Sequence, residues 1–495
     1  MDLQKLLDTL PEKRISGNIK KIDVKGIVYD PLRVQKDFIY VAINIYTQLD
    51  KVELPDGHPF VDDAIRNGAT AVVLQKDRQL PDSIIKVVVP DSRLALGLLA
   101  NAFYDYPSRK MKVIGVTGTN GKTTTTHIIE SILIQNHKVG LIGTLYYKLN
   151  GEIRKSKDTT PEPPDLQAIL QQMADRDFDY VTLEASSHGI DFHRLTGIDF
   201  DVAVFTNLTQ DHLDYHKTME AYLQTKLRLF QWLSPDKSAV VNSDDPASGS
   251  FIAATRAHVL TYGLNHDADI TAKNIKMTLE GTHFDLVTPA GTIQVNSGLI
   301  GRHNLYNTLA AVGVAISQKI DLETIKSGLE RPIYVSGRFE LVKKGQNFAV
   351  VVDYAHTPDG IENVLSLAKK LNPHRVITVF GCGGDRDREK RPIMGRVAAQ
   401  YSDFILLTSD NPRNEEPAAI LAQIASGIKN SPVPVETIID RQQAINRAIR
   451  MAQPNDIVMI LGKGHETTQT IREKTIDFND RIEAEKALDS LLGQN

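Results

Sequence analysis

The sequence predicts an α/β protein built from about three domains. Its 495 residues exceed the size of one typical domain roughly threefold. From residue 112 onward, short apolar runs typical of buried strands alternate with helical patterns, and the same alternation begins again near residue 348. Continuous apolar strands separated by helices are typical of parallel sheets covered by helices on both faces. We therefore expect two such sheets, preceded by a smaller N-terminal domain.

The composition is that of an ordinary globular chain and excludes several other classes. Hydrophobic residues make up 41% and charged residues 24% of the sequence, which excludes collagen, a coiled coil or global disorder. The net charge is -4, so the chain is not a general polyanion binder and has to bind any phosphate through a local site.

The single cysteine and the first residues of the chain predict a cytoplasmic protein. Cys382 has no partner for an intramolecular disulfide and cannot form a thiolate metal cluster. Residues 1–14 contain neither a basic segment followed by an apolar one nor a small-residue cleavage site, so no export signal is expected. The most apolar stretch, 94–103, is shorter than the ~20 residues that span a bilayer and is predicted to be a buried helix.

Residues 1–108 are predicted to form the small N-terminal α/β domain. Strand-rich runs occur at 38–46 and 70–75, and helical patterns occur at 61–67 and 93–105. The turn-forming sequence Tyr-Pro-Ser then ends this part of the chain, and the pattern changes after it.

Residues 109–332 are predicted to form a central domain with a parallel sheet. A strand over 112–116 leads into a glycine-rich turn and then into a helix that begins near Thr123. Short strands interrupted by Gly and Asn over 258–300 predict an antiparallel addition to this domain, and a helix follows at 304–318. Further buried strands are expected at 138–143, 180–185, 201–208 and 238–243.

Residues 333–495 are predicted to form a second α/β domain. Arg331-Pro332 and Ser336-Gly337 indicate a linker between this domain and the central one. Apolar strand candidates follow, each with a helical or loop segment after it, at 348–355, 376–381, 404–409, 435–440 and 457–462.

The sequence Gly118-Thr119-Asn120-Gly121-Lys122-Thr123 has the properties of a nucleotide-phosphate loop. It follows a predicted strand and begins a predicted helix, so backbone N–H groups and the positive helix end can converge on one anion. Lys122 would contact the β- and γ-phosphates, and the Thr123 hydroxyl would bind Mg²⁺. The usual first glycine is displaced, since Val116 stands five residues before Gly121. A glycine-rich turn with a chance Lys-Thr pair is the alternative, and kinases, ATPases and ligases all use such loops.

Acidic and imidazole side chains follow the strands expected beside this loop. Glu184 ends one of these strands and would hold a metal across the top of the sheet. His212 follows the next strand and is a candidate ligand of a second metal, whereas His216 can equally be a surface or supporting histidine. Structural roles without a metal are the alternative for the whole cluster. Lys226 lies in a helical segment and on its own would be read as a surface lysine.

A series of ordered motifs resembles those of the Mur ligase family. They are TGTNGKTTT (117–125), TTP (159–161), EASSHG (184–189), TNLTQDHLDYH (206–216), GRHNLYN (301–307), SGRFE (336–340), DYAHTPD (353–359), GCGGDRDREKRP (381–392), TSDNPRNEEP (408–417) and GKGHE (462–466). The resemblance covers about residues 109 to 480, and agreement in order over so many motifs excludes chance.

The resemblance implies a function divided among three domains. The N-terminal domain would bind the UDP part of UDP-N-acetylmuramoyl-L-alanyl-D-glutamate, the central P-loop-type ATPase domain would bind ATP, and the Rossmann-like C-terminal domain would bind an amino acid. The implied enzyme is an ATP-dependent ligase of peptidoglycan synthesis, and hence of cell wall biogenesis, cell shape and cell division. The precursor carboxylate becomes an acyl phosphate, an amine attacks it, and phosphate leaves. Both reactants of the first step are anionic, so charge neutralisation and positioning are the main catalytic tasks.

The resemblance also implies roles for individual residues, with ATP and Mg²⁺ as cofactors. Lys122, Lys226 and His212 would act in catalysis. The metal ligands would be Thr123, Glu184, His212 and Lys226, the last as a carbamate. The residues expected to bind ATP are Gly118, Thr119, Asn120, Gly121, Lys122, Thr123, Thr124, Asn304, Arg338, Asp353 and His356. Those expected to bind the UDP precursor are Thr159, Thr160, Ser186 and Arg194.

One stretch, Asp410-Asn411-Pro412-Arg413, indicates which amino acid is added. In the family, arginine in the last position accompanies meso-diaminopimelate, whereas relatives that add lysine lack it. Diaminopimelate carries a distal carboxylate that lysine does not, and a guanidinium binds a carboxylate with two parallel hydrogen bonds. The residues expected to bind this amino acid are Arg386, Asp410, Asn411, Pro412, Arg413, Gly462 and Glu466. Taken alone, the same stretch is typical of a turn at a strand end.

The N-terminal domain departs from the family pattern. The usual Asp-Ser-Arg is replaced by Asp30-Pro31-Leu32 with Arg33 one place late, and Phe192 stands where glutamine is common, so no N-terminal site residue is predicted. The alternatives are a related ligase that adds L-lysine or another amino acid, a folylpolyglutamate-synthase-like ligase, and a non-catalytic ATP-binding protein. The expected protein is a monomer whose partners are its small-molecule substrates, with no nucleic acid and no membrane insertion.

Overall fold

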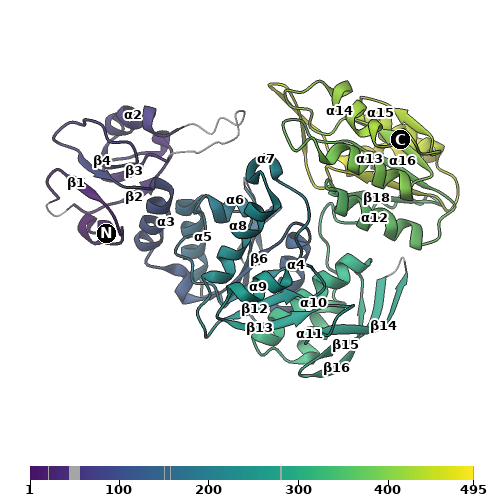
Figure 1. Ribbon diagram of the computed structural model, residues 1–495, viewed down its shortest axis with the longest axis horizontal. Helices are drawn as coiled ribbons and strands as arrows, with labels where there is room; N and C mark the ends of the chain where they lie inside the picture. Colours follow the sequence, from purple (N-terminus) through teal and green to yellow (C-terminus); the bar gives the residue numbers. More distant parts are fainter. Residues whose placement is uncertain (20–21, 44–55, 150, 157, 279–280, 494–495) are drawn as a thin grey trace.

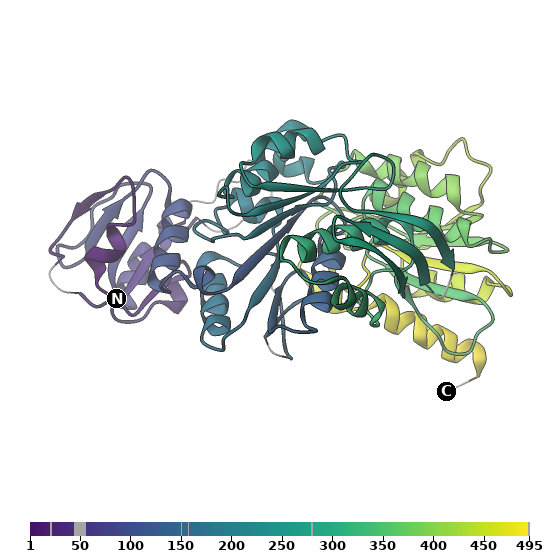
Figure 2. The same ribbon diagram turned by 90° about the horizontal axis from the view of Figure 1, so that it is seen from below.

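Three α/β units follow one another along the chain in the computed structural model, each around its own main sheet (Figure 1). We call them the N-terminal, central and C-terminal units. The N-terminal unit lies at one end of the molecule, and the central unit lies between it and the C-terminal unit (Figures 1 and 2). The predicted α/β class is confirmed. The structure describes residues 1–19, 22–43, 56–149, 151–156, 158–278 and 281–493.

The N-terminal unit is a five-stranded sheet in the order β1-β5-β4-β3-β2, in which only β1 runs antiparallel to its neighbour. The helix predicted over 93–105 is α3, which packs on the sheet through buried residues such as Leu96 and Leu99. The strand predicted over 38–46 begins as β3, and its last three residues lie outside the described part of the chain. The bounds are β1 (Arg14–Ser16), β2 (Gly26–Val28), β3 (Phe38–Val41), β4 (Ala69–Leu74), β5 (Ile85–Val88), α1 (Leu3–Leu7), α2 (Val61–Arg66), α3 (Ser92–Phe103), and the 3-10 helices Pro31–Arg33, His58–Phe60 and Pro107–Lys110.

The central unit contains an eight-stranded sheet in the order β13-β12-β11-β6-β10-β7-β8-β9. The strands from β13 to β7 are parallel, and β8 and β9 extend the sheet as an antiparallel hairpin that the sequence reasoning did not predict. The strand bounds are β6 (Lys112–Thr117), β7 (Val139–Ile142), β8 (Tyr146–Leu149), β9 (Glu152–Lys155), β10 (Tyr180–Glu184), β11 (Val202–Phe205), β12 (Ser238–Asn242) and β13 (His258–Tyr262).

Helices bury both faces of the central sheet, as the continuous apolar strands predicted. One hydrophobic core joins the sheet to α5, α8 and α9, and a second joins its other face to α4, α10 and α11. The helix bounds are α4 (Lys122–Leu133), α5 (Pro163–Ala174), α6 (Ser187–Asp191), α7 (Leu213–His216), α8 (Met219–Gln231), α9 (Ser248–Ala254), α10 (Arg302–Ser317) and α11 (Leu322–Glu330).

The prediction of an antiparallel addition over 258–300 was wrong in its first part. β13 belongs to the central sheet and runs parallel to β12. As the edge strand it is only partly buried, and this mixed exposure gives the same broken apolar pattern that an antiparallel strand would give. The separate antiparallel sheet consists of β14 (Thr271–Thr278), β15 (Gly281–Thr288) and β16 (Gly291–Ser297).

The C-terminal unit is a six-stranded sheet in the order β17-β18-β22-β19-β20-β21, in which only β17 is antiparallel to its neighbour. Two hydrophobic cores lie on its two faces. The bounds are β17 (Glu340–Leu341), β18 (Ala349–Asp353), β19 (Val376–Phe380), β20 (Phe404–Leu407), β21 (Val435–Thr437), β22 (Ile457–Leu461), the hairpin of β23 (Thr468–Ile471) and β24 (Lys474–Asp477), α12 (Pro358–Lys370), α13 (Lys390–Tyr401), α14 (Pro417–Ser426), α15 (Arg441–Met451) and α16 (Asp480–Leu492).

The strand order of the central sheet places three predicted motifs at one edge. β6 pairs with both β10 and β11, and all three strands run in the same direction. The glycine-rich loop after β6, Glu184 at the end of β10 and the segment after β11 therefore meet at the carboxyl edge. A search of the described helices for one long and apolar enough to cross a bilayer finds none.

Candidate active site

The glycine-rich loop between β6 and α4 has room for no side chain at its two glycines. Gly118 has a φ of +144°, and a Cβ there would lie 1.9 Å from the Thr206 hydroxyl oxygen. Gly121 has a φ of +87°, and its Cβ would lie 2.3 Å from the Asn307 amide oxygen. Positive φ and close neighbours both require glycine here. Gly121 caps the N-terminus of α4, so the positive end of the helix faces the loop.

Residues after β11 hold this loop in place. The Thr206 hydroxyl donates to the Asn120 carbonyl at 2.7 Å, and the Asn120 N–H donates to the Asn207 side-chain oxygen at 2.9 Å. The Thr119 N–H donates to the Asn207 carbonyl at 2.9 Å. Sequence reasoning placed Thr206 and Asn207 in a motif but gave them no role. Their function is to fix the loop backbone.

Two lysine side chains share one acceptor in the loop. Lys122 Nζ donates to the carbonyls of Gly118 at 2.9 Å and Thr119 at 2.7 Å, and Lys226 Nζ donates to the same Gly118 carbonyl at 2.9 Å. Lys226 is 1% exposed and its ammonium lies 4.3 Å from the centre of the Tyr222 ring. Burial, and then the charge of Lys122, hold the pKa of Lys226 well below its ordinary value. Lys226 is therefore a core residue of the site and not the surface lysine that its helix suggested.

Glu184 is a buried carboxylate surrounded by neutral donors. The Thr123 hydroxyl lies 3.0 Å from both of its oxygens, the Thr144 N–H donates to it at 2.8 Å, and the Thr144 hydroxyl donates at 3.0 Å. A hydroxyl and a carboxylate in contact are oxygen ligands that suit Mg²⁺. In the described residues, no group of three or more His, Cys, Asp or Glu side chains is arranged to hold a metal.

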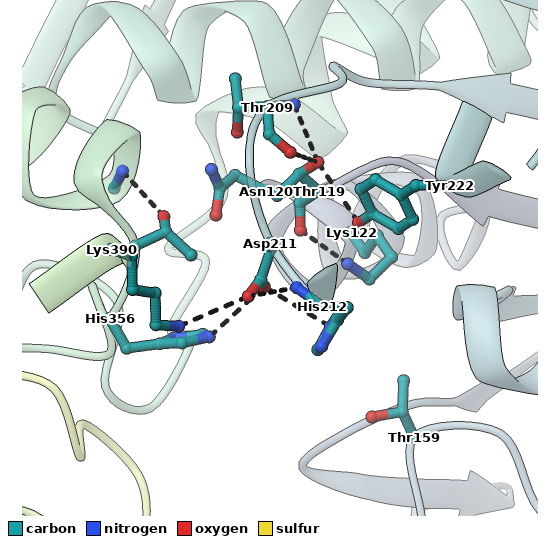
Figure 3. A network of polar contacts seen from close by, with 12 residues as sticks. Thr119, Asn120, Lys122, Thr159, Thr209, Asp211, His212, Tyr222, His356 and Lys390 are labelled. Carbon is teal, nitrogen blue, oxygen red and sulfur yellow. Dashed lines mark hydrogen bonds and ion pairs between the residues drawn. The ribbon is translucent and has the colours of Figure 1, made fainter. Parts of the chain in front are cut away.

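Asp211 joins the central unit to the C-terminal unit beside the loop (Figure 3). Its carboxylate lies 3.4 Å from His212 Nε2, 3.4 Å from Lys390 Nζ and 3.8 Å from His356 Nε2, the last two reaching it from the C-terminal unit. Burial raises the pKa of Asp211, but the charge of Lys390 and the hydrogen bond with His356 outweigh that effect and hold the pKa well below its usual range. Burial lowers the pKa of His212 to about 3, so His212 is neutral and its imidazole can bind a metal.

One cavity of about 470 Å³ brings together residues from all five predicted groups, the amino-acid candidates being represented by Arg386 alone. Figure 3 shows Thr159 on the far side of this space from Lys122. The phosphate loop, the metal candidates and the precursor candidates therefore face a common volume, which is the arrangement a transfer between two bound substrates needs. The predicted site residues that line it are Thr119, Asn120, Gly121, Lys122, Thr123, Thr159, Thr160, Glu184, Ser186, Arg194, His212, Lys226, Arg338, His356 and Arg386.

A second cavity of about 310 Å³ adjoins the loop between the central and C-terminal units. The Asn120 amide donates to Asp359 at 2.7 Å across this junction. Asp353 accepts the N–H groups of Phe339 at 2.6 Å and Ala355 at 2.7 Å, so its carboxylate shapes the backbone of the linker. The predicted ATP-binding residues that line this cavity are Asn120, Gly121, Thr124, Asn304, Arg338, Asp353 and His356. A third cavity, of about 1,090 Å³, is lined by residues of the linker and of the C-terminal unit, and Thr124, Asn304 and Arg338 are the predicted site residues in its lining.

The precursor candidates are held by a buried charge cluster at the junction with the N-terminal unit. Arg194 donates to the Thr160 carbonyl at 2.8 Å and lies 2.9 Å from Glu162, while Arg93 of α3 lies 3.3 Å from the same glutamate. Both guanidinium groups contact the Phe192 ring, at 4.8 Å for Arg93 and 5.8 Å for Arg194. The aromatic residue in the place of the usual glutamine thus serves as a surface for two arginines.

Replacing Glu162 with Gln should destabilise this junction. Arg93, Glu162 and Arg194 are each less than a tenth exposed. Loss of the carboxylate removes the anion that both guanidinium groups share and leaves Arg194 only Asp158, at 3.5 Å, among the acidic side chains that the structure describes. We expect the free energy of the first unfolding transition in urea to fall by about 3 kcal/mol. Glu152→Gln, which removes an exposed glutamate, is the matched control. If Glu162→Gln and Glu152→Gln have the same free energy for the first unfolding transition, the charge cluster contributes nothing to the stability of this junction.

The amino-acid candidates form a separate cluster at the carboxyl edge of the C-terminal sheet. The Asn411 amide donates to Glu466 at 2.8 Å, and the buried Lys463 lies 2.6 Å from the same carboxylate and 3.2 Å from the Asn411 side-chain oxygen. The structure thus pairs Glu466 with Lys463, which sequence reasoning missed. Asp410 lies under Gly462, where a Cβ would approach its carboxylate to 2.7 Å. Apart from Arg386, none of the predicted amino-acid-binding residues lines the two cavities described above.

Arg413 is held in an unusual backbone conformation by the β23–β24 hairpin. Its φ is +49°, its N–H donates to the Thr470 carbonyl at 3.1 Å, and its carbonyl accepts the Arg472 N–H at 2.6 Å. Its guanidinium donates to the Gly384 carbonyl at 2.7 Å. Burial, followed by the charge of Arg386, lowers its pKa. Two close guanidinium groups at one end of the cluster favour an anionic ligand.

Two family models match the chain. The Mur ligase middle domain matches residues 116–315, and the Mur ligase, glutamate ligase domain matches residues 337–464. Among curated relatives, UDP-N-acetylmuramoyl-L-alanyl-D-glutamate–2,6-diaminopimelate ligase of Bacillus velezensis is 45% identical over 99% of both chains. The ligase of the same name from Syntrophomonas wolfei is 42% identical, again over 99% of both chains.

Solved structures resemble the whole chain. A structure of a UDP-N-acetylmuramoyl-L-alanyl-D-glutamate–2,6-diaminopimelate ligase superimposes with a TM-score of 0.66 at 34% identity, covering 95% of both chains. A MurF ligase from Thermotoga maritima, solved with ADP, has a TM-score of 0.67 at 20% identity and covers 94% of this chain and 99% of its own. A Mycobacterium tuberculosis folylpolyglutamate synthase has a TM-score of 0.63 at 16% identity over 82% of this chain and 95% of its own. The last two similarities establish the fold alone.

Proposed function

Since this chain belongs to the Mur ligase family, we propose that it adds meso-diaminopimelate to UDP-N-acetylmuramoyl-L-alanyl-D-glutamate in peptidoglycan synthesis, with hydrolysis of ATP to ADP. The proposal is carried by one observation: the phosphate loop and the precursor candidates face one cavity, in a chain 45% identical over its length to a ligase of that name. The folylpolyglutamate-synthase-like alternative is supported by the fold alone.

We assign one substrate to each predicted domain. Residues 1–108 would hold the UDP end of the precursor, 109–332 would hold ATP, and 333–495 would hold diaminopimelate. The location of the phosphate loop in the central unit and of Arg413 in the C-terminal unit supports the last two assignments. The cytoplasmic location and the monomeric state remain predictions.

The phosphate loop would bind the nucleotide through its backbone and Lys122. The N-terminus of α4 points its free N–H groups at the loop, and Lys122 places an ammonium beside them. Thr123 and Glu184 would hold Mg²⁺, which would neutralise phosphate charge when bound. The precursor carboxylate would attack the γ-phosphorus and form the acyl phosphate as the bond from this phosphorus to the ADP oxygen breaks and ADP leaves. The loop donors would stabilise the negative charge that accumulates on the transferred group.

His212 and Lys226 would form a second metal position nearer the precursor. Both line the same cavity as Thr159, Thr160 and Arg194. As a carbamate, Lys226 would give this position an anionic oxygen and would remove the repulsion between two ammonium groups that now share the Gly118 carbonyl. Arg194 would hold an anionic group of the precursor, and its contacts with Thr160 and Glu162 would fix its direction.

In the C-terminal unit, the two guanidinium groups of Arg386 and Arg413 would bind the distal carboxylate of diaminopimelate. Glu466 would bind its distal ammonium, because one of its oxygens accepts from Lys463 and Asn411 and the other would face the ligand. Asn411 would hold Glu466 in place through this hydrogen bond. The domain closure that the family reaction requires would bring the reacting amine to the acyl phosphate.

The test of this function is phosphate release from ATP and Mg²⁺ in the presence of the UDP-dipeptide. We expect release with meso-diaminopimelate and little with L-lysine. Release with lysine instead would identify a lysine-adding ligase, and release with a folate substrate would support the folylpolyglutamate alternative. No release with any amino acid would indicate a non-catalytic nucleotide-binding protein.

Arg413→Ala should change the amino-acid preference. Loss of the guanidinium leaves the distal carboxylate of diaminopimelate without its bidentate partner, so kcat/KM for diaminopimelate should fall about 100-fold. The low activity with lysine should stay within about threefold, because lysine lacks that carboxylate. Arg472→Ala removes an exposed arginine from the neighbouring hairpin and is the control. Unchanged turnover of diaminopimelate by Arg413→Ala would contradict the assignment.

A further inference from the structure

The two candidate Mg²⁺ ligands belong to a closed ring of hydrogen bonds. Thr123 donates to Glu184 at 3.0 Å, and Glu184 accepts the Thr144 N–H at 2.8 Å. Thr144 lies in the turn that leads into β8, which begins at Tyr146. The Tyr146 hydroxyl lies 2.9 Å from His127 Nε2, and His127 Nδ1 lies 2.7 Å from the Thr123 carbonyl. The ring thus returns to the residue where it began.

The contacts of His127 fix its tautomer and the direction of its ring. A carbonyl only accepts hydrogen bonds, so Nδ1 carries the proton that is donated to Thr123. Nε2 is then the acceptor, and the Tyr146 hydroxyl donates to it. The two rings meet edge to face at 5.5 Å, and His127 is only 5% exposed. His127 therefore links the first turn of α4 to one particular atom of β8.

Tyr146 fixes the turn that carries Thr144. The Gly143 N–H donates to the Tyr146 carbonyl at 3.2 Å and closes the turn between β7 and β8. Thr144 has both its N–H and its hydroxyl on Glu184. A shift of Tyr146 would move these two donors and, with them, the carboxylate. The ring therefore holds the Thr123 hydroxyl and the Glu184 carboxylate relative to each other from two sides.

We propose that His127 and Tyr146 are positioning residues that hold Thr123 and Glu184 in the arrangement that binds Mg²⁺ with the nucleotide. The inference rests on the proposed function, because it needs Thr123 and Glu184 to be the ligands. Side chains that orient metal ligands through hydrogen bonds contribute 10- to 100-fold to metal affinity or activity in other metal sites. A purely structural ring would instead affect only the stability of the fold.

Tyr146→Phe removes the tyrosine hydroxyl from the ring of hydrogen bonds and leaves the aromatic packing in place. Tyr147→Phe is the matched control, because Tyr147 is the next residue, is similarly half-buried, and its hydroxyl makes none of the ring contacts. Calorimetric titration with ADP is repeated at a series of Mg²⁺ concentrations. The Mg²⁺ concentration that gives half of the full increase in ADP affinity is the Mg²⁺ midpoint. We expect this midpoint to rise about 10-fold in Tyr146→Phe and to stay unchanged in Tyr147→Phe. ADP affinity without Mg²⁺ should be the same in all three proteins.

His127→Asn tests the same link from the other side. The asparagine amide keeps a donor near the Thr123 carbonyl but cannot reach Tyr146, so its Mg²⁺ midpoint should match that of Tyr146→Phe. An unchanged midpoint in either variant, with or without a lower melting temperature, would overturn the inference. A wild-type protein whose ADP binding does not respond to Mg²⁺ would instead overturn the proposed function on which the inference rests.

Discussion

Replacement of Lys122 by methionine is expected to lower kcat for amide formation about 1,000-fold, the upper range for loss of one preorganised donor that acts on developing charge. The carboxylate that attacks and the phosphate that it attacks are both anionic. Lys122 is the ammonium that the chain places inside the phosphate loop, with Nζ within 2.9 Å of two loop carbonyls. Methionine keeps the length of the side chain and removes its charge.

Phosphate release under saturating ATP and precursor measures this effect. Lys122→Arg keeps the charge but not the compact ammonium, so we expect it to retain more activity than Lys122→Met. Lys138→Met removes an exposed lysine just beyond the other end of α4 and should leave kcat unchanged. A tenfold or smaller loss in Lys122→Met would show that the backbone of the loop, and not this lysine, provides the stabilisation.

Lys226→Ala is also expected to lower kcat about 1,000-fold, but for a different reason. This substitution would remove a metal ligand, whereas Lys122→Met removes a positive charge. The neutral amine of Lys226 would attack the carbon of CO₂, form an N–C bond and release a proton to solvent. The product is an anionic carbamate, whose oxygens are suitable ligands for Mg²⁺. Burial, and then the charge of Lys122, hold the pKa of Lys226 well below its ordinary value, which favours the neutral amine that this reaction needs.

Two measurements test the carbamate directly. Native mass spectrometry of active protein kept under CO₂ should show the added mass of one CO₂, and Lys226→Ala should not. A short carboxylate such as acetate should partly restore activity to Lys226→Ala, because it supplies the missing oxygen ligand, and should not restore Lys122→Met. A bare amine in fully active wild-type protein, or acetate rescue of both variants, would refute the carbamate.

Local sequence was sufficient to predict the position of the glycine-rich loop between a strand and a helix. Its identity depends on spacing within a few residues, and the flanking strand and helix supply the rest: β6 ends at Thr117 and α4 begins at Lys122. The same holds for Glu184, since a residue at the end of a parallel strand has to lie at the carboxyl edge of the sheet. Their roles in binding remain predictions, but their positions follow from short-range pattern.

Contacts between distant segments could not be read from the sequence. Asp211 and Lys390 lie 179 positions apart, and only the docking of the C-terminal unit on the central unit brings them together. Arg93 and Glu162 meet in the same way at the other junction. Each residue alone has the pattern of a solvated surface charge. Nothing in its immediate neighbours shows that it will be buried opposite an ion of the other sign.

The β8–β9 hairpin could have been predicted and was overlooked. Asn150-Gly151 in the sequence is a strong signal for a two-residue hairpin turn, and β8 and β9 pair antiparallel on either side of it. The omission matters for the site, because β8 carries Tyr146 and the turn before it carries Thr144. The parallel pairing of β13, in contrast, could not be predicted from its sequence. This edge strand is partly exposed, so it lacks the continuous apolar pattern of a buried parallel strand.

The bond between Asn120 and Asp359 has a kinetic consequence. It joins the glycine-rich loop to the first turn of α12 in the C-terminal unit, and the Asp211–Lys390 pair is a second contact between the same two units. Under the proposed function, nucleotide would bind in the cavity beside these contacts. We therefore expect product release to require the two units to separate, and the rate of that separation would then set an upper limit on turnover.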